Sequence, residues 1–245
     1  MHRFYAPGFQ HDREIALPED EAHHVARVLR LKAGERVVIF DGHGGEAVAV
    51  IQAVERQNVI VKAVEARVSA GEPAISLTLA QAMLKHDKME QVIRDAVMLG
   101  VTAIQPFFSA RTDVPRAAVR DGGRQERWDR TVLSSVKQCG RAVLPVVHPA
   151  ITFDELLKAE RQALALMFVE PSAAGSECVS LQSLETRVPA QATLLIGPEG
   201  GWDPQEIRAA VTAGVTLVSM GSRVLRADIA GALAISVLQY VWKDL

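Results

Sequence analysis

The segment Leu194–Trp202 contains three glycines in five residues, directly after an apolar run of strand length. Glycine adopts backbone conformations that other residues avoid, and it lets N–H groups approach a ligand closely. The next residues predict a capped helix, with Asp203 at the N-cap, Pro204 at N1 and Glu206 at N3. The spacing fits neither a dinucleotide loop nor a P-loop. The segment is therefore either a ligand loop of another kind or an ordinary tight strand-to-helix turn.

A second loop, Ser219–Asp228, follows the next predicted strand and also leads into a helix. Its two arginines, Arg223 and Arg226, are separated by two apolar residues and must project differently. One of them can face a ligand while the other pairs with a carboxylate. Alternatively, both only brace the loop, through Asp228 or Glu199.

A basic stripe is expected near the N-terminus. On a helix over residues 19–31, His23, Arg27 and Arg30 lie at i, i+4 and i+7, and Arg3 is close in sequence. The stripe can contact phosphates or be a solvated surface. Adjacent histidines without a cysteine or acidic ligand at metal spacing argue against zinc.

The elements around these residues divide near residue 70. Before it, three β-rich segments surround one helix and predict a small barrel: 36–41, 46–53 and 59–68. After it, strands alternate with helices, which predicts a mainly parallel sheet covered on both faces. The expected strands are 75–81, 103–108, 163–169, 193–196 and 216–219, and the expected helices are 88–99, 125–139, 204–213 and 227–242. Ligands of such sheets bind outside the carboxyl ends of the strands.

Composition excludes several classes of protein. With 49% hydrophobic residues and a net charge of -2, the chain can bury a core and is not disordered. The longest apolar stretch, 229–241, is interrupted by polar residues and is too short to span a bilayer. Cys139 and Cys178 lie far apart, so neither a disulfide scaffold nor a CxxC metal or redox motif fits. The N-terminus has no apolar signal region, so nothing indicates secretion. We expect a cytoplasmic protein without a metal. The last helix is apolar nearly all round, which predicts a subunit interface as well as a core.

Several of these residues together resemble a known family. Residues 196–201 read Ile-Gly-Pro-Glu-Gly-Gly and residues 221–226 read Gly-Ser-Arg-Val-Leu-Arg, in order and at the right distance from the C-terminus. Weaker likenesses cover residues 3–5, 23–32, 40–42, 85–100 and 138–141. The chain thereby resembles the RsmE family of 16S ribosomal RNA uridine N3-methyltransferases, in the SPOUT superfamily.

The resemblance implies an α/β fold: a PUA-like β-barrel over residues 1–70 that binds RNA, and a SPOUT domain over residues 71–245 with a deep trefoil knot. It implies S-adenosylmethionine as cofactor, methylation of a specific uridine at N3, and a homodimer formed through the knotted domain. The partner would be 16S rRNA in the small ribosomal subunit. The cofactor loops would be 169–175, 196–201 and 220–225. The implied cofactor residues are Val169, Glu170, Leu195, Ile196, Gly197, Pro198, Glu199, Gly200, Gly201, Met220, Gly221, Arg223, Val224 and Leu225.

Roles for charged residues follow from the expected reaction. Uracil N3 must lose a proton, so we expect a cation beside the developing anion, from Arg223, Arg226 or Arg141, and Glu199 as a candidate base. The expected RNA-binding residues are Arg3, His23, His24, Arg27 and Arg30, with six arginines of the segment 111–130 as further phosphate contacts. The family commonly has Glu and Thr where this chain has Asp228 and Ile229. Two alternatives stay open: ribose 2′-O-methylation, and a non-catalytic rRNA-binding assembly factor.

Overall fold

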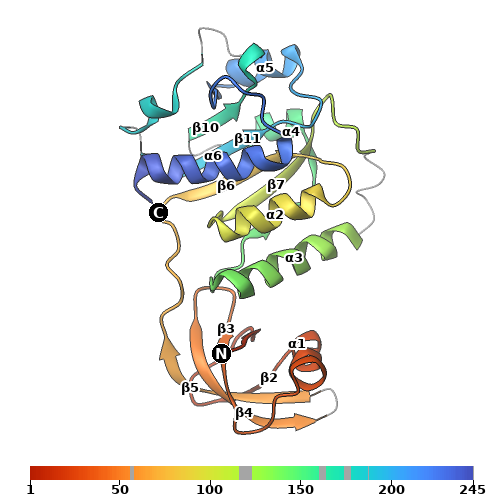
Figure 1. Cartoon of the computed structure of the whole chain (residues 1–245), viewed down its shortest axis with the longest axis vertical. Coiled ribbons are helices and arrows are strands. Elements are labelled where there is room, and N and C mark those ends of the chain that lie inside the picture. The colour runs from red at the N-terminus through yellow and green to blue at the C-terminus, as the bar shows by residue number, and fades with distance from the viewer. Residues whose placement is uncertain (56–57, 116–122, 160–163, 174–177, 187, 245) are drawn as a thin grey trace. The chain divides into compact units, whose positions relative to one another are not determined.

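The computed structural model describes residues 1–55, 58–115, 123–159, 164–173, 178–186 and 188–244 (Figure 1). The chain forms two compact units. The N-terminal unit combines Met1–Glu72 with Leu133–Leu144, and the C-terminal unit combines Pro73–Val132 with Pro145–Leu245. The chain therefore passes between the units three times.

A five-stranded sheet builds the N-terminal unit, in the order β1-β3-β4-β5-β2. The strands are β1 (Arg3–Tyr5), β2 (Glu14–Ala16), β3 (Arg36–Phe40), β4 (Glu46–Glu55) and β5 (Asn58–Arg67). The three predicted strands are confirmed as β3, β4 and β5. The sequence did not indicate β1 and β2, because three residues are too few to show an alternating pattern. Only β1 and β3 pair in parallel; the other pairs are antiparallel.

The predicted helix over residues 19–31 takes a different form. It begins as α1 (Glu19–His23) and continues as a π-helix, η1 (His24–Leu29), which ends at Arg30 in the left-handed region with φ 55°. A π-helix is wider than an α-helix, so the side chains after His23 are spaced differently from the expected α-helix, but His23, Arg27 and Arg30 are all exposed as expected. Val25 still packs in the core with Phe4, Ile39 and related residues.

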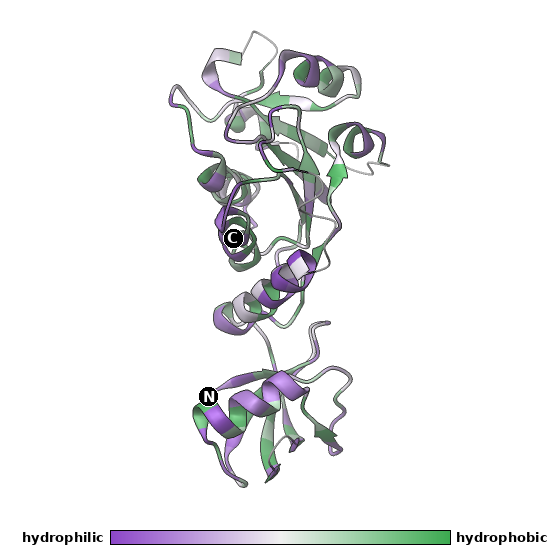
Figure 2. Ribbon diagram, turned by 90° about the vertical axis from the view of Figure 1, so that its right-hand side faces the viewer, coloured by the Kyte–Doolittle hydropathy of each residue, from purple (hydrophilic) through white to green (hydrophobic). Residues whose placement is uncertain are grey.

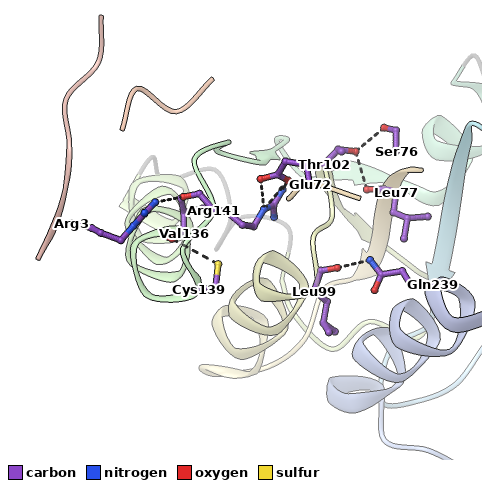
Figure 3. Close-up of polar contacts among 10 residues, drawn as sticks. All are labelled: Arg3, Glu72, Ser76, Leu77, Leu99, Thr102, Val136, Cys139, Arg141 and Gln239. Carbon is purple, nitrogen blue, oxygen red and sulfur yellow. Dashed lines mark hydrogen bonds and ion pairs between the residues drawn. The ribbon is translucent and has the colours of Figure 1, made fainter. Parts of the chain in front are cut away.

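The segment Leu133–Leu144 belongs to the N-terminal unit and is joined to it by partly buried ion pairs. The guanidinium of Arg141 donates to both carboxylate oxygens of Glu72, at 2.6 to 3.1 Å, and Arg3 donates to the carbonyl oxygen of Arg141 at 2.7 Å (Figure 3). Lys137 donates to Glu21 at 2.7 and 2.8 Å. A division of the sequence near residue 70 did not anticipate this return of the chain, because it depends on pairs far apart in sequence.

The C-terminal unit contains a parallel sheet of seven strands. Six form the order β12-β10-β11-β6-β7-β8, and β9 pairs with β7. The strands are β6 (Ser76–Ala82), β7 (Ala103–Phe108), β8 (Val146–Val147), β9 (Ile151–Thr152), β10 (Leu164–Phe168), β11 (Gln191–Ile196) and β12 (Thr216–Val218). All five predicted strands and the parallel α/β class are confirmed. Figure 2 shows these strands mostly in the hydrophobic colour, whereas the helices carry both colours.

Helices cover both faces of this sheet. On one face, α2 (Lys88–Met98) lies beside α6 (Ala227–Trp242), where Gln239 donates to the carbonyl oxygen of Leu99 at 2.7 Å (Figures 1 and 3). On the other, α4 (Phe153–Lys158) and α5 (Pro204–Thr212) pack on a core that includes Phe107 and Met167. Helix α3 (Gly123–Cys139) confirms the helix predicted over 125–139. Two 3₁₀ turns among the described residues are Pro171–Ala173 and Leu181–Leu184.

Helix α4 was missed although its start is visible in the sequence. Thr152 and Glu155 form a reciprocal capping box, in which the Thr152 hydroxyl accepts from the Glu155 N–H at 3.2 Å. A threonine followed three residues later by glutamate is the signature of this motif. The helix has only six residues, so no apolar period marks it.

Candidate functional site

Three loops meet because three parallel strands end at the same edge of the sheet. Phe168 at the end of β10 is in register with Ile196 of β11 and with Val218 of β12. The loops that follow these strands therefore leave from neighbouring points. This is the edge at which open α/β sheets bind their ligands.

A pocket of about 300 Å³ lies between these loops. It brings together most of the predicted cofactor residues: Val169, Glu170, Ile196, Gly197, Pro198, Glu199, Gly201, Met220, Gly221, Arg223, Val224 and Leu225, with Arg226 beside them. Leu195 and Gly200 do not line it. Pro171, within the predicted loop 169–175, also lines it. The lining residues that were not predicted are Lys88, Phe168, Trp202, Ala227, Asp228 and Ala230. The volume is at the lower end of that of small-molecule pockets.

Trp202 forms a rigid wall of the pocket. Its ring nitrogen donates to the carbonyl oxygen of Phe168 at 2.8 Å, and its ring stacks on Phe107 with centroids 5.9 Å apart. A Cβ atom at Gly197 would lie 3.0 Å from this ring. A side chain at 197 would therefore have to shift an indole that is held by stacking and by a hydrogen bond, which favours glycine at this position.

The glycine loop closes with a tight turn. The N–H of Gly201 donates to the carbonyl oxygen of Pro198 at 3.1 Å, and Gly201 has φ 70°. A Cβ atom here would lie 2.5 Å from Oε1 of Glu170, so that carboxylate packs over the turn. The glycine therefore allows both the left-handed conformation and the contact with the neighbouring loop.

The predicted N-cap of α5 is confirmed, and one of its residues also contacts the loop after β7. Asp203 caps the helix in a capping box with Glu206, and Pro204 occupies the first turn. The buried Glu206 carboxylate also accepts from the Ser109 hydroxyl at 3.0 Å and from the Ala110 N–H at 2.8 Å. The residues after β7 are thereby tied to the loop after β11.

The charged side chains of the pocket differ in whether they have an ion-pair partner. Lys88 pairs with Glu199 at 2.9 Å, and Arg226 makes a two-point contact with Asp228 at 2.9 and 3.0 Å. Arg223 is exposed and has no ion-pair partner among the residues that the structure describes. Lys88 begins α2 after β6, which ends at the same edge of the sheet. The rule that ligands bind at that edge could have identified it.

Arg141, predicted as another cation for the reaction, lies elsewhere. It is buried in the N-terminal unit and held by Glu72, and it does not line the pocket. Near the pocket, Lys85 pairs with Asp113 at 2.6 Å, and this hydrogen bond raises the pKa of Lys85, which stays a cation at neutral pH.

The expected RNA-binding residues separate into two groups. His23, Arg27 and Arg30 are exposed. Arg3 instead pairs with Glu46, and His24 packs edge-on against the ring of Phe4. Burial, followed by the nearby charge of Lys137, lowers the pKa of His24, so its imidazole is neutral at pH 7.

The arginines between 111 and 130 also differ in their contacts. Arg127 pairs with Asp87 and Glu90, and Arg111 lies against Asp203. Arg116 and Arg120 lie outside the described residues.

Within the described ranges, no cluster of three metal-ligating side chains occurs. No helix of that part of the chain is both long enough and apolar enough to cross a bilayer.

Comparison with known proteins identifies this architecture. Residues 70–239 match the model of an RNA methyltransferase domain, and residues 17–64 match that of an RNA methyltransferase PUA domain. Ribosomal RNA small subunit methyltransferase E of Synechocystis is 33% identical over 91% of this chain and 71% of its own. The chain belongs to the RsmE family of RNA methyltransferases.

Further members of the family agree over nearly the whole length. The Bacillus subtilis enzyme of the same name is 27% identical over 92% of this chain and 90% of its own. The RsmE structure from Neisseria gonorrhoeae, bound to S-adenosylmethionine, superposes with a TM-score of 0.86 at 31% identity, covering 99% of this chain and 98% of that one. A Legionella pneumophila methyltransferase with the same cofactor superposes at 0.89, with 29% identity and coverage of 97% and 96%.

The contact of Gly197 with Trp202 predicts a cost for any side chain at residue 197. In G197A the new Cβ must displace an indole fixed by stacking and a hydrogen bond, so the free energy of unfolding should fall by about 1–3 kcal/mol. Urea denaturation measures it. The matched control is G71A, because a Cβ at Gly71 has no neighbour within 4 Å. A G197A protein as stable as wild type and G71A would contradict this packing.

Proposed function

We propose that this protein transfers the methyl group of S-adenosylmethionine to N3 of a uridine in 16S ribosomal RNA of the small subunit. The observation that carries the proposal is the pocket between the loops after β10, β11 and β12, in a chain of the RsmE family. Two members or close neighbours of that family bind this cofactor in their solved structures. A trefoil knot in the C-terminal unit remains part of the proposal.

The lining of the pocket fits the cofactor chemically. Phe168, Ile196, Val224 and Leu225 supply apolar surface for an adenine ring. Gly197 and Gly221 bring backbone N–H groups to the pocket wall, although the Gly221 carbonyl oxygen already accepts from the Ser219 hydroxyl at 3.3 Å. Glu170 supplies a carboxylate for hydroxyl or amino groups. Among the described residues the Glu170 side chain has no hydrogen-bond partner, so it is available to a ligand. When bound, the cofactor supplies an electrophilic sulfonium methyl group.

The chain's own residues would hold the uracil and move its proton. Holding two reactants in place can contribute about 7–11 kcal/mol in model reactions. Arg223 and Arg226 are the proposed cations for the developing uracil anion, and Glu199 is the proposed base, held at the pocket by Lys88. Arg141 acts in this proposal only if a second subunit brings it to the pocket.

The N-terminal unit would bind the RNA beyond the target nucleotide. The exposed His23, Arg27 and Arg30 can contact phosphates, which fix a protein on its RNA without reading sequence. The target uracil must leave its stack to enter this pocket. Arg3 and His24 would act from within the fold, by supporting this surface. An rRNA-modifying enzyme of this kind would work in the cytoplasm.

The experiment that tests this function uses tritiated S-adenosylmethionine and small subunits from cells lacking the endogenous enzyme. Digestion of the rRNA to nucleosides should place the label in 3-methyluridine. Label in a ribose-methylated nucleoside would establish the other SPOUT reaction. Cofactor binding without any label would overturn the substrate assignment, and no binding at all would favour the assembly-factor alternative.

Replacing Arg226 tests its role in the same assay. R226A should slow methyl transfer by about 10²-fold, because a cation aimed at the developing anion is lost, while cofactor affinity stays within about twofold. The matched control is K158A, which removes an exposed cation of α4 outside the pocket. A folded R226A protein with the wild-type rate would remove Arg226 from the mechanism.

The family resemblance and helix α6 together support a homodimer. Ile229, Leu233 and Tyr240 lie on one side of α6 and are 45%, 40% and 75% exposed, whereas its other sides are buried. We propose that this apolar face packs against a second copy. L233D should yield a monomer in light scattering, because a carboxylate would be buried unpaired. The control V211D changes an equally exposed residue of α5. Dimeric L233D would exclude this face.

A further inference from the structure

A second cavity lies on the other side of the wall formed by Glu170 and Trp202. Its volume is about 420 Å³, and we call it the α5 cavity. Its lining consists of Arg111, Glu170, Ser172, Ala173, Trp202, Pro204, Ile207 and Arg208. Glu170 and Trp202 also line the cofactor pocket. Whatever occupies the α5 cavity is therefore a direct neighbour of the reaction site.

Two arginines give this cavity a positive rim. Arg208 is exposed on α5 and has no ion-pair partner among the residues that the structure describes. Arg111 approaches its partners only at long distance, 3.3 Å to the carbonyl oxygen of Gly200 and 3.4 Å to Asp203. Both guanidinium groups keep donors free. Two planar guanidinium groups at one cavity suit a phosphate group.

The position of Arg111 is fixed by the fold. The Glu206 carboxylate accepts from Ser109 and Ala110 immediately before it, and also from the N–H of Asp203 at 3.1 Å. A Cβ atom at Gly200 would lie 3.2 Å from the backbone oxygen of Arg111, so the two loops are in close contact. The backbone of Arg111 is thus held at the cavity before a ligand arrives, so only its side chain must become ordered on binding.

The rest of the lining suits a ligand that carries a sugar or base as well as a phosphate. Ala173, Pro204, Ile207 and the edge of Trp202 are apolar and suit the face of a sugar or base. The Ser172 hydroxyl can donate to or accept from a ribose hydroxyl. A carboxylate next to the arginines disfavours a bare anion. Together these groups match one nucleotide of an RNA strand.

We propose that the α5 cavity binds the nucleotide adjacent to the methylated uridine, with its phosphate on Arg111 and Arg208 and its 2′-hydroxyl on Ser172. The inference rests on the proposed function, since the RNA strand enters the neighbouring pocket. Arg208 and Arg111 are binding residues in this proposal, and neither touches the transferred methyl group. The cavity thereby fixes the strand on which the uracil is presented.

The test uses the full-length R208Q protein and small ribosomal subunits that lack the methyl group. Filter binding over a range of KCl concentrations at constant Mg²⁺ measures affinity and its salt dependence. R208Q should weaken binding by about fivefold to tenfold and lower the slope of log K against log salt by about one. Its affinity for S-adenosylmethionine, measured by calorimetry, should match wild type. R208K should restore part of the affinity for the subunit.

The matched control is K158Q, which removes an exposed positive charge of the same unit outside both cavities. If R208Q binds subunits like K158Q, the inference is overturned. If R208Q instead weakens cofactor binding and leaves subunit binding unchanged, the cavity holds part of the cofactor and the inference is also overturned. Failure of the proposed function is a separate result, because wild type would then give no 3-methyluridine whatever R208Q binds.

Discussion

The site depends on one constraint, the parallel pairing of β10 with β11 and β12. Parallel strands bring their carboxyl ends to one edge, and the in-register ends at Phe168, Ile196 and Val218 start three loops side by side. Each loop contributes what the others lack: a carboxylate from Glu170, open backbone from the glycine loop, and cations from the loop that precedes α6. With antiparallel pairing, the carboxyl ends of neighbouring strands would lie at opposite edges, and these loops would not meet.

Two buried groups turn these loops into a fixed site. Trp202 is held by Phe107 and by the carbonyl oxygen of Phe168, and its close approach favours glycine at 197. Glu206 accepts hydrogen bonds from the loop after β7 and from the start of α5. A buried carboxylate with three donors is well satisfied, so it adds rigidity rather than strain. The loops are therefore organised before any ligand binds.

Much of this arrangement could be predicted from the sequence. Alternation of strands and helices gave the parallel sheet, and the spacing of Asp203, Pro204 and Glu206 gave the start of α5, because both are local patterns. The edge rule placed the loops after β10, β11 and β12 together. The same rule applied to β6 would have included Lys88, which pairs with Glu199.

Other features depend on contacts that no local pattern records. The apolar residues from His24 to Leu29 follow a pattern that also fits an α-helix, so the sequence indicated a helix there but not that it is a π-helix. The grouping of Leu133–Leu144 with the N-terminal unit requires the pairing of Arg141 with Glu72, 69 residues apart. The α5 cavity likewise joins Arg111, which was expected to contact phosphate, with Arg208, which is distant in sequence and belongs to no motif.

The most direct test of this account is hydrogen–deuterium exchange with and without S-adenosylmethionine. The cofactor should slow amide exchange in three separate segments, 168–173, 196–202 and 219–226, because all three loops contact it at one edge of the sheet. Exchange in β4 and β5 of the N-terminal unit should not change. Protection confined to a single loop, or found only in the N-terminal unit, would contradict a site built from the ends of three parallel strands.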